Sequence, residues 1–70
     1  MFNLEVFKER LKELRKEANI SSVALAKILQ VRDTTILRWE KGKMIPTIDK
    51  LYSIAKFFKV SSDYLLGLED

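Results

Sequence analysis

Four side chains near the middle of the chain combine hydrogen-bonding groups with helical spacing: Asp33, Thr34, Leu37 and Arg38. Residues three and four apart lie on one face of a helix, so these four share a face. Arginine can donate two hydrogen bonds to guanine, threonine can contact a base edge or a thymine methyl group, and a carboxylate can accept from cytosine. The face therefore suits the major groove of DNA. The same pattern is also typical of a helical hairpin whose polar face is simply exposed to water.

Two of these residues and one neighbour have a second interpretation. Asp33 would also lie near phosphates, so its role could be limited to stabilising the positive end of the helix dipole. Leu37 either touches a thymine methyl group or covers the edge of the core. Thr35 is predicted to be a phosphate or packing residue rather than a base reader.

Polar residues at the ends of neighbouring segments predict contacts with phosphate. Ser21 and Ser22 open the preceding helix, whose free amides and positive dipole end attract anions. For Ser21, capping that helix is the expected main role. Lys41 and Lys43 flank Gly42 just after the central helix, where they either bind phosphate independently of sequence or are solvated.

Five helices joined by short turns are predicted to hold these residues. The chain has only two glycines and one proline, and Asn3, Ser21, Thr47 and Ser61 are each placed to cap a helix start. The expected ranges are about 4–18, 21–29 and 33–41, followed by a fourth helix after Thr47 and a fifth between Ser61 and Gly67. The chain is thus predicted to be a single all-α domain spanning residues 1–70.

The apolar residues predict one shared core. Those at inward helical positions are Phe7, Leu11, Leu14, Ala18, Leu25, Ala26, Leu29, Ile36, Trp39, Ile48, Leu51, Ile54, Ala55 and Phe58. Ala26 is small enough for the second and third helices to cross closely. Apolar residues outside these stripes, namely Ile28, Tyr52, Phe57 and Leu68, leave surface that could pair two subunits.

Composition argues against several classes of function. The chain has no cysteine and no histidine, no glycine-rich phosphate loop and no paired carboxylates in a plausible cleft, so no enzyme activity, metal or cofactor is expected. No apolar run is long enough to cross a bilayer, and the start is not typical of a signal peptide, so a cytoplasmic protein is expected. The net charge of +3 does not by itself distinguish a nucleic-acid-binding protein from one with a solvated basic surface. A protein-interaction module would call for an acidic or apolar third helix, whereas Arg38, Lys41 and Lys43 favour DNA. Helix one has the pattern of a membrane-binding helix, but the helix caps and apolar stripes along the chain argue for a packed domain instead.

Almost the whole chain resembles the Cro/repressor-type helix-turn-helix domains of phage and bacterial regulators, often called the Xre family. The resemblance rests on FKERLKELRKEANIS, LAKILQV, TTILRWEKGK with the following IPTIDKLYSIAKFFKV, and SSDYLLG, in the family's order and spacing. It implies a lambda-repressor-like bundle of five helices, with helix two across the phosphates and helix three in the major groove.

The resemblance also implies a function. The chain would be a bacterial or phage-encoded transcriptional regulator, expected to be a repressor, that binds a near-palindromic double-stranded operator as a homodimer. Base reading from the position of Arg38 and a backbone grip by the loop of Lys41 and Lys43 are family features. A partly buried salt bridge between Arg15 and Glu40 would join helix one to the recognition helix, and Arg15 could also reach a phosphate.

Four positions depart from the family pattern. Ser22 stands where a glutamine usually contacts phosphate, and Gln30 and Lys59 stand where glycine is common. Arg32 replaces the serine or threonine that caps the recognition helix. The capping oxygen could instead come from Asp33, or Arg32 could contact a phosphate or base.

Overall fold

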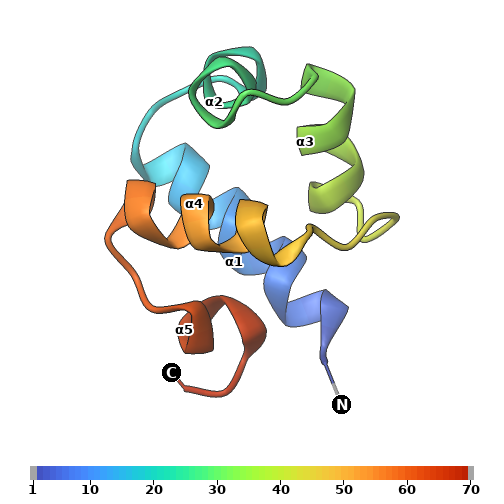
Figure 1. Cartoon of the computed structure of the whole chain (residues 1–70), viewed down its shortest axis with the longest axis vertical. Coiled ribbons are helices and arrows are strands. Elements are labelled where there is room, and N and C mark those ends of the chain that lie inside the picture. Colours follow the sequence, from blue (N-terminus) through green and yellow to red (C-terminus); the bar gives the residue numbers. More distant parts are fainter. Residues whose placement is uncertain (1, 70) are drawn as a thin grey trace.

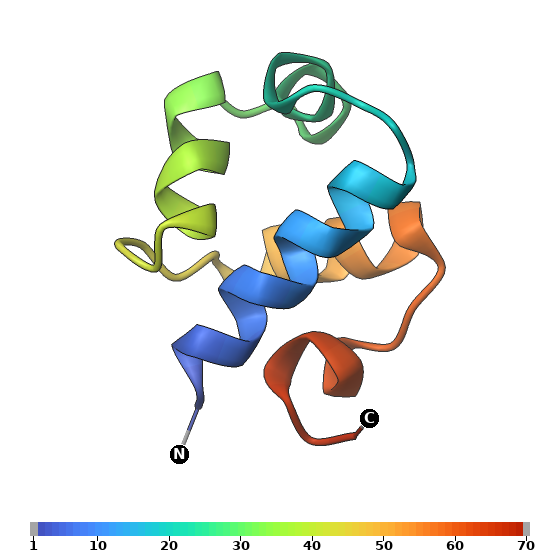
Figure 2. The ribbon, with the colours of Figure 1, turned by 180° about the vertical axis from the view of Figure 1, so that it is seen from behind.

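Five helices form the fold of residues 2–69, the part of the chain that the computed structural model describes, and no strand occurs among those residues. They are α1 (Leu4–Glu17), α2 (Ser22–Leu29), α3 (Asp33–Glu40), α4 (Ile48–Phe58) and α5 (Ser62–Leu66). α1 and α4 cross at the centre, with α2 and α3 on one side of them and α5 on the other (Figure 1). The view from behind shows the same arrangement (Figure 2). The predicted all-α architecture is confirmed.

Side-chain caps begin four of the helices where the sequence predicted them. Asn3 accepts hydrogen bonds from the amides of residues 5 and 6 at 3.1 and 3.3 Å. Ser21, Thr47 and Ser61 each accept from the amide three residues later, at 3.0, 3.2 and 3.0 Å. These bonds satisfy amides that have no partner within the helix, so they fix where α1, α2, α4 and α5 start.

Left-handed residues end the helices. Asn19, Gln30 and Lys59 all have φ of 58°, and Gly42, which follows α3, has φ of 72°. The left-handed conformation costs a residue with a Cβ roughly 1 kcal/mol, so Gln30 and Lys59 carry strain that glycine would avoid. At Gly42 there is a second constraint, because an added Cβ would lie 3.2 Å from the Cδ atom of Lys8 on α1.

One core gathers apolar side chains from every helix. Its buried members are Phe7, Leu11, Leu25, Ala26, Leu29, Ile36, Trp39, Ile54, Ala55 and Leu65. Ala26 is only 3% exposed, as expected for the small residue where α2 meets α3. The partly buried residues packed against this cluster include Leu14, Leu51 and Phe58.

The prediction that Ile48 and Ala18 face the core is wrong. Ile48 is 87% exposed, and Ala18 is exposed as well. Ile48 is the first residue of α4 and Ala18 follows the last residue of α1. Periodicity gives a direction around a helix axis, but burial also requires a neighbour at that height, and the helix ends lack one. Ile28, Tyr52, Phe57 and Leu68 are exposed as predicted.

Within residues 2–69, no helix has the length and apolar character needed to cross a membrane. The same residues contain no group of His, Cys, Asp and Glu side chains that could hold a metal ion.

Two isoleucines of α4 provide a matched test of this core. Ile54 is fully buried, whereas Ile48 is almost fully exposed. We expect Ile54→Ala to lower the free energy of unfolding by ~3 kcal/mol through lost burial and a new cavity, and Ile48→Ala to change it by no more than about 0.5 kcal/mol. Urea denaturation followed by the fluorescence of Trp39, the single tryptophan, measures both. Equal losses in the two variants would contradict the observed orientation of α4.

Candidate functional site

The helix α3 has one buried and one open face. Ile36, Trp39 and Glu40 point inward, against α1 and α2. On the opposite side Asp33, Thr34 and Arg38 are exposed, as is Leu37 with 39% of its surface accessible. All four residues predicted to read bases are therefore on the open face.

Five predicted site residues line one open hollow on this side of the molecule: Thr34, Leu37, Arg38, Lys41 and Lys43. Three of the five carry a positive charge, and Leu37 contributes an apolar surface between polar groups. The hollow therefore offers cations, a hydroxyl group and a methyl-sized contact to one ligand. Ser21 and Ser22 at the start of α2 lie outside it.

The loop after α3 folds back so that Lys43 joins the hollow. The amide of Lys43 donates to the carbonyl of Arg38 at 2.9 Å, and the amide of Gly42 donates to the carbonyl of Trp39 at 3.2 Å. These bonds satisfy carbonyls that the helix end leaves without partners. They also fix the backbone of Lys43 beside that of Arg38.

The start of α3 lacks an ordinary side-chain cap. Arg32 occupies the capping position in extended conformation, makes no capping hydrogen bond and is exposed. The carboxylate of Asp33 instead accepts from the amide of Thr34 at 3.0 Å. The side chain of Arg32 is thus not needed for the helix start. Thr35 is half-buried, which fits packing as well as contact with phosphate.

Ser21 and Ser22 differ in what they leave available at the start of α2. The Oγ atom of Ser21 already accepts from the amide of Ala24, in line with its predicted main role as a cap. Ser22 is the first helical residue and is half-buried. Its short side chain adds little reach beyond the free amides of the helix end.

Arg15 and Glu40 form a two-pronged ion pair that joins α1 to α3. The Nε atom of Arg15 donates to one carboxylate oxygen of Glu40 at 2.6 Å, and Nη2 donates to the other at 3.0 Å. The side chains are 17% and 6% exposed, respectively. A further bond of 3.1 Å runs from Nη1 of Arg15 to the carbonyl of Ile20. The pair implied by the family resemblance is therefore present, and it also holds the segment between α1 and α2.

The hydrogen bond with Glu40 raises the pKa of Arg15, and it outweighs burial, which acts in the opposite direction. A raised pKa contributes stability that is fully present below the pKa of arginine in the unfolded chain. That stability is lost only as the pH rises through the higher value of the folded protein. The guanidinium is therefore charged throughout the neutral range.

Two cations make contacts that the sequence did not predict. The ammonium of Lys50 on α4 donates to the carbonyl of Leu29 at 2.8 Å. The guanidinium of Arg10 on α1 lies 4.2 Å from the ring centre of Tyr64 and donates to the carbonyl of Glu69 at 2.6 Å. A lysine in the first turn of a helix opposes the helix dipole, which is a signal that Lys50 serves another element. No comparable feature of the sequence indicates that Arg10 contacts another element.

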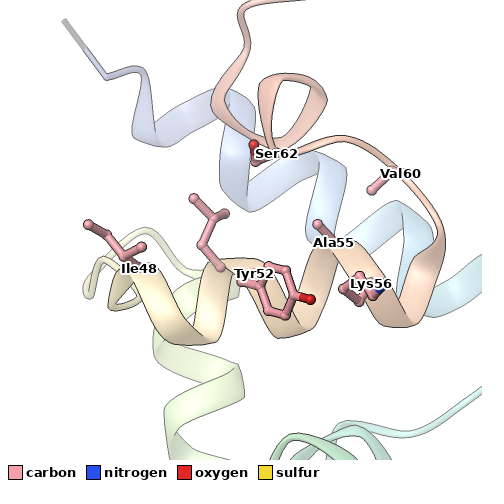
Figure 3. Close-up of a pocket in the computed structure, with 7 residues that line it drawn as sticks. Ile48, Tyr52, Ala55, Lys56, Val60 and Ser62 are labelled. Carbon is pink, nitrogen blue, oxygen red and sulfur yellow. The ribbon is translucent and has the colours of Figure 1, made fainter.

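A second hollow lies on α4 and has different chemistry (Figure 3). Its lining residues are Ile48, Leu51, Tyr52, Ala55, Lys56, Val60 and Ser62. They include no carboxylate and are mainly apolar. This arrangement offers no acid–base pair for catalysis, and it leaves Ile48 and Tyr52 as apolar surface.

Comparison with known proteins gives consistent matches. Residues 8–70 match a family model described as a helix-turn-helix domain. The chain is 42% identical over 64 residues to the transcriptional activator BcrR of Enterococcus faecalis, covering 91% of this chain but 31% of that protein. It is 40% identical over 63 residues to an uncharacterised HTH-type transcriptional regulator of Methanocaldococcus jannaschii, covering 90% of this chain and 96% of that one.

A solved structure matches as well. The c2 repressor of Salmonella phage P22, in a crystal structure with a synthetic operator, superposes with a TM-score of 0.86 at 31% identity, covering 91% of this chain and 97% of that one. The full P22 repressor sequence is longer, and this chain spans 30% of it.

The Arg15–Glu40 pair yields a stability prediction. Glu40→Leu leaves the largely buried Arg15 without its partner, so we expect a loss of ~3 kcal/mol in the free energy of unfolding. The double variant Arg15→Met with Glu40→Leu removes both charges and is expected to be more stable than Glu40→Leu alone. Thermal and urea denaturation of the wild type, Arg15→Met, Glu40→Leu and the double variant measures this. A double variant that loses the sum of both single losses would show that the two residues act independently.

Proposed function

Because the chain belongs to the helix-turn-helix domain family, and its five helices have the Cro/repressor-type, lambda-repressor-like arrangement, we propose that it binds double-stranded DNA and regulates transcription. The family is a non-enzymatic class, so this domain is not an enzyme. The observation that carries the proposal is the open face of α3, where three cations gather beside Thr34 and Leu37.

In this proposal α3 enters the major groove. Arg38 donates to guanine, and Thr34 contacts a base edge or a thymine methyl group one turn earlier. Leu37 adds a methyl contact from the same hollow. Asp33 accepts from cytosine with the carboxylate oxygen that its bond to Thr34 leaves free. Support comes from exposure, because none of these side chains is needed for the core.

Six further residues are proposed to bind phosphate: Ser21, Ser22, Arg32, Thr35, Lys41 and Lys43. The amides at the start of α2 supply donors beside the two serines. Arg32 is exposed and takes no part in capping α3, which leaves it able to reach the backbone. The lysines after α3 supply charge without reading sequence.

A homodimer on a near-palindromic operator completes the proposal. Apolar side chains are exposed beyond the DNA-facing side, with Tyr52 and Leu68 at 62% and 73%. A second copy could cover part of this surface, and two-fold symmetry would place one α3 on each half-site.

We further propose that the protein is a repressor that acts in the cytoplasm of a bacterium or is encoded by a phage. P22 C2 is named a repressor, although BcrR is named an activator.

Selection of binding sites from a random DNA pool tests this function. We expect the wild-type protein to enrich one sequence that occurs as an inverted repeat, bound by two copies. Arg38→Ala should keep its fold and lose preference at one base pair of each half-site, with a discrimination loss of ~1–3 kcal/mol. In vitro transcription from a promoter carrying the selected site should fall when the protein is added.

Four results would count against parts of this proposal. No enrichment would oppose sequence-specific DNA binding itself. A selected site without symmetry would oppose the homodimer, and unchanged preference in Arg38→Ala would remove this residue from the base readers. Increased transcription would indicate an activator.

Salt dependence separates phosphate contacts from base contacts. We expect Lys43→Gln to weaken binding about equally for all sequences and to lower the slope of log affinity against log salt by roughly one unit. Lys59→Gln is the matched control, because Lys59 is exposed at the end of α4 and is not part of the hollow. Fluorescence anisotropy at several salt concentrations measures both slopes. An equal effect of the two variants would mean that only net charge matters.

A further inference from the structure

A hydrogen bond joins α4 to the end of α2, where the turn toward α3 begins. The ammonium of Lys50 donates to the carbonyl of Leu29 at 2.8 Å, in a partly buried position. Leu29 is the last residue of α2, and α3 begins at Asp33. The contact therefore lies at the turn that sets how the two helices meet.

The carbonyl of Leu29 needs a partner from outside its own helix. The last carbonyls of a helix have no amide one turn ahead to bind. In α2, the amides of Gln30 and Val31 donate to the carbonyls of Lys27 and Ala26. The carbonyl of Leu29 receives its hydrogen bond from Lys50 instead.

The charge of Lys50 is placed for α2 and not for its own helix. Lys50 is the third residue of α4, where a positive charge opposes the positive end of the helix dipole. Its ammonium instead lies at the C-terminal end of α2, where the dipole attracts a cation. The position is therefore unfavourable within α4 and favourable toward α2.

The turn contains an unfavourable backbone conformation. Gln30 holds the left-handed conformation with φ of 58°, which side-chain-bearing residues adopt at a cost. At its far end α3 is held by the bond of Glu40 to Arg15, whereas at its near end Arg32 gives no capping bond. Lys50 thus acts on the turn that leads into α3, and Arg15 acts at the other end of α3.

We propose that Lys50 is a positioning residue for DNA reading: by holding the carbonyl of Leu29 it fixes the turn after α2 and, through it, the place of α3 in the groove. Lys50 itself does not touch DNA. The role in reading rests on the proposed function, whereas the effect on the turn can be measured in the free protein.

The first measurement is amide hydrogen exchange of the free protein. We expect Lys50→Met, which keeps the apolar stem but not the charge, to speed exchange at Gln30 and Val31 about tenfold relative to amides in α1. Lys50→Arg keeps a cationic donor and should restore most of the protection. Lys56→Met is the matched control on the exposed side of α4 and should leave both amides unchanged. Unchanged exchange in Lys50→Met would overturn the proposal.

The second measurement is the ratio of affinities for the selected operator and a scrambled duplex, at several salt concentrations. We expect Lys50→Met to lower this ratio about tenfold with an unchanged salt slope, and Lys50→Arg to recover it. A slope reduced by about one unit would make Lys50 a phosphate ligand and overturn the proposal. Faster exchange with an unchanged ratio would overturn it too, by limiting Lys50 to stability. Failure of the wild-type protein to bind DNA would instead refute the proposed function. The exchange measurement would still test whether Lys50 stabilises the turn.

Discussion

The two-pronged bond between Arg15 and Glu40 determines where α3 lies. A helix of eight residues is too short to be stable by itself in water, so its position depends on the contacts of its inner face. Trp39 and Ile36 supply apolar burial on that face but little directionality. The guanidinium and carboxylate add a fixed geometry, since two parallel hydrogen bonds allow only one orientation. Removing either partner leaves the other charge with little access to water, so the loss of one residue alone is expected to destabilise the fold.

Because the inner face of α3 makes these contacts, the side chains of Thr34, Leu37 and Arg38 on its outer face are not required to hold the helix in place. Arg38 and Thr34 are exposed without any role in packing or capping. The fold then adds Lys43, because the hydrogen bond from the backbone amide of Lys43 to the carbonyl of Arg38 turns the loop back onto the helix end. The overall charge of +3 would not have located this site. What matters is that the fold gathers cations from a helix and a loop into one hollow.

Local features of the fold could be predicted from the sequence, because their causes lie within a few residues. The caps at Asn3 and Thr47 depend only on neighbouring backbone groups. Ile48 was predicted wrongly, since its burial depends on whether another helix reaches the start of α4. The contact of Lys50 with Leu29 spans 21 positions and depends on how α4 lies relative to α2, which no local pattern contains. For the candidate site, the sequence could predict that the polar side chains of α3 share one exposed face. It could not predict which atom each side chain binds, because that depends on a partner molecule.

The difference between local and long-range causes also explains how the turn after α2 can have Gln30 in place of glycine. The left-handed Gln30 costs roughly 1 kcal/mol. A hydrogen bond from a charged donor contributes about 1.5–3 kcal/mol in general, and less where water can compete, as it can at the partly buried Lys50. The two effects are thus of similar size, so one long-range contact can offset one unfavourable local choice. A turn held in this way depends on α4, whereas a glycine turn would be stable through its own conformation. The helix α3 is therefore coupled to the rest of the bundle at its far end through Glu40 and, through the turn that precedes it, at its near end as well.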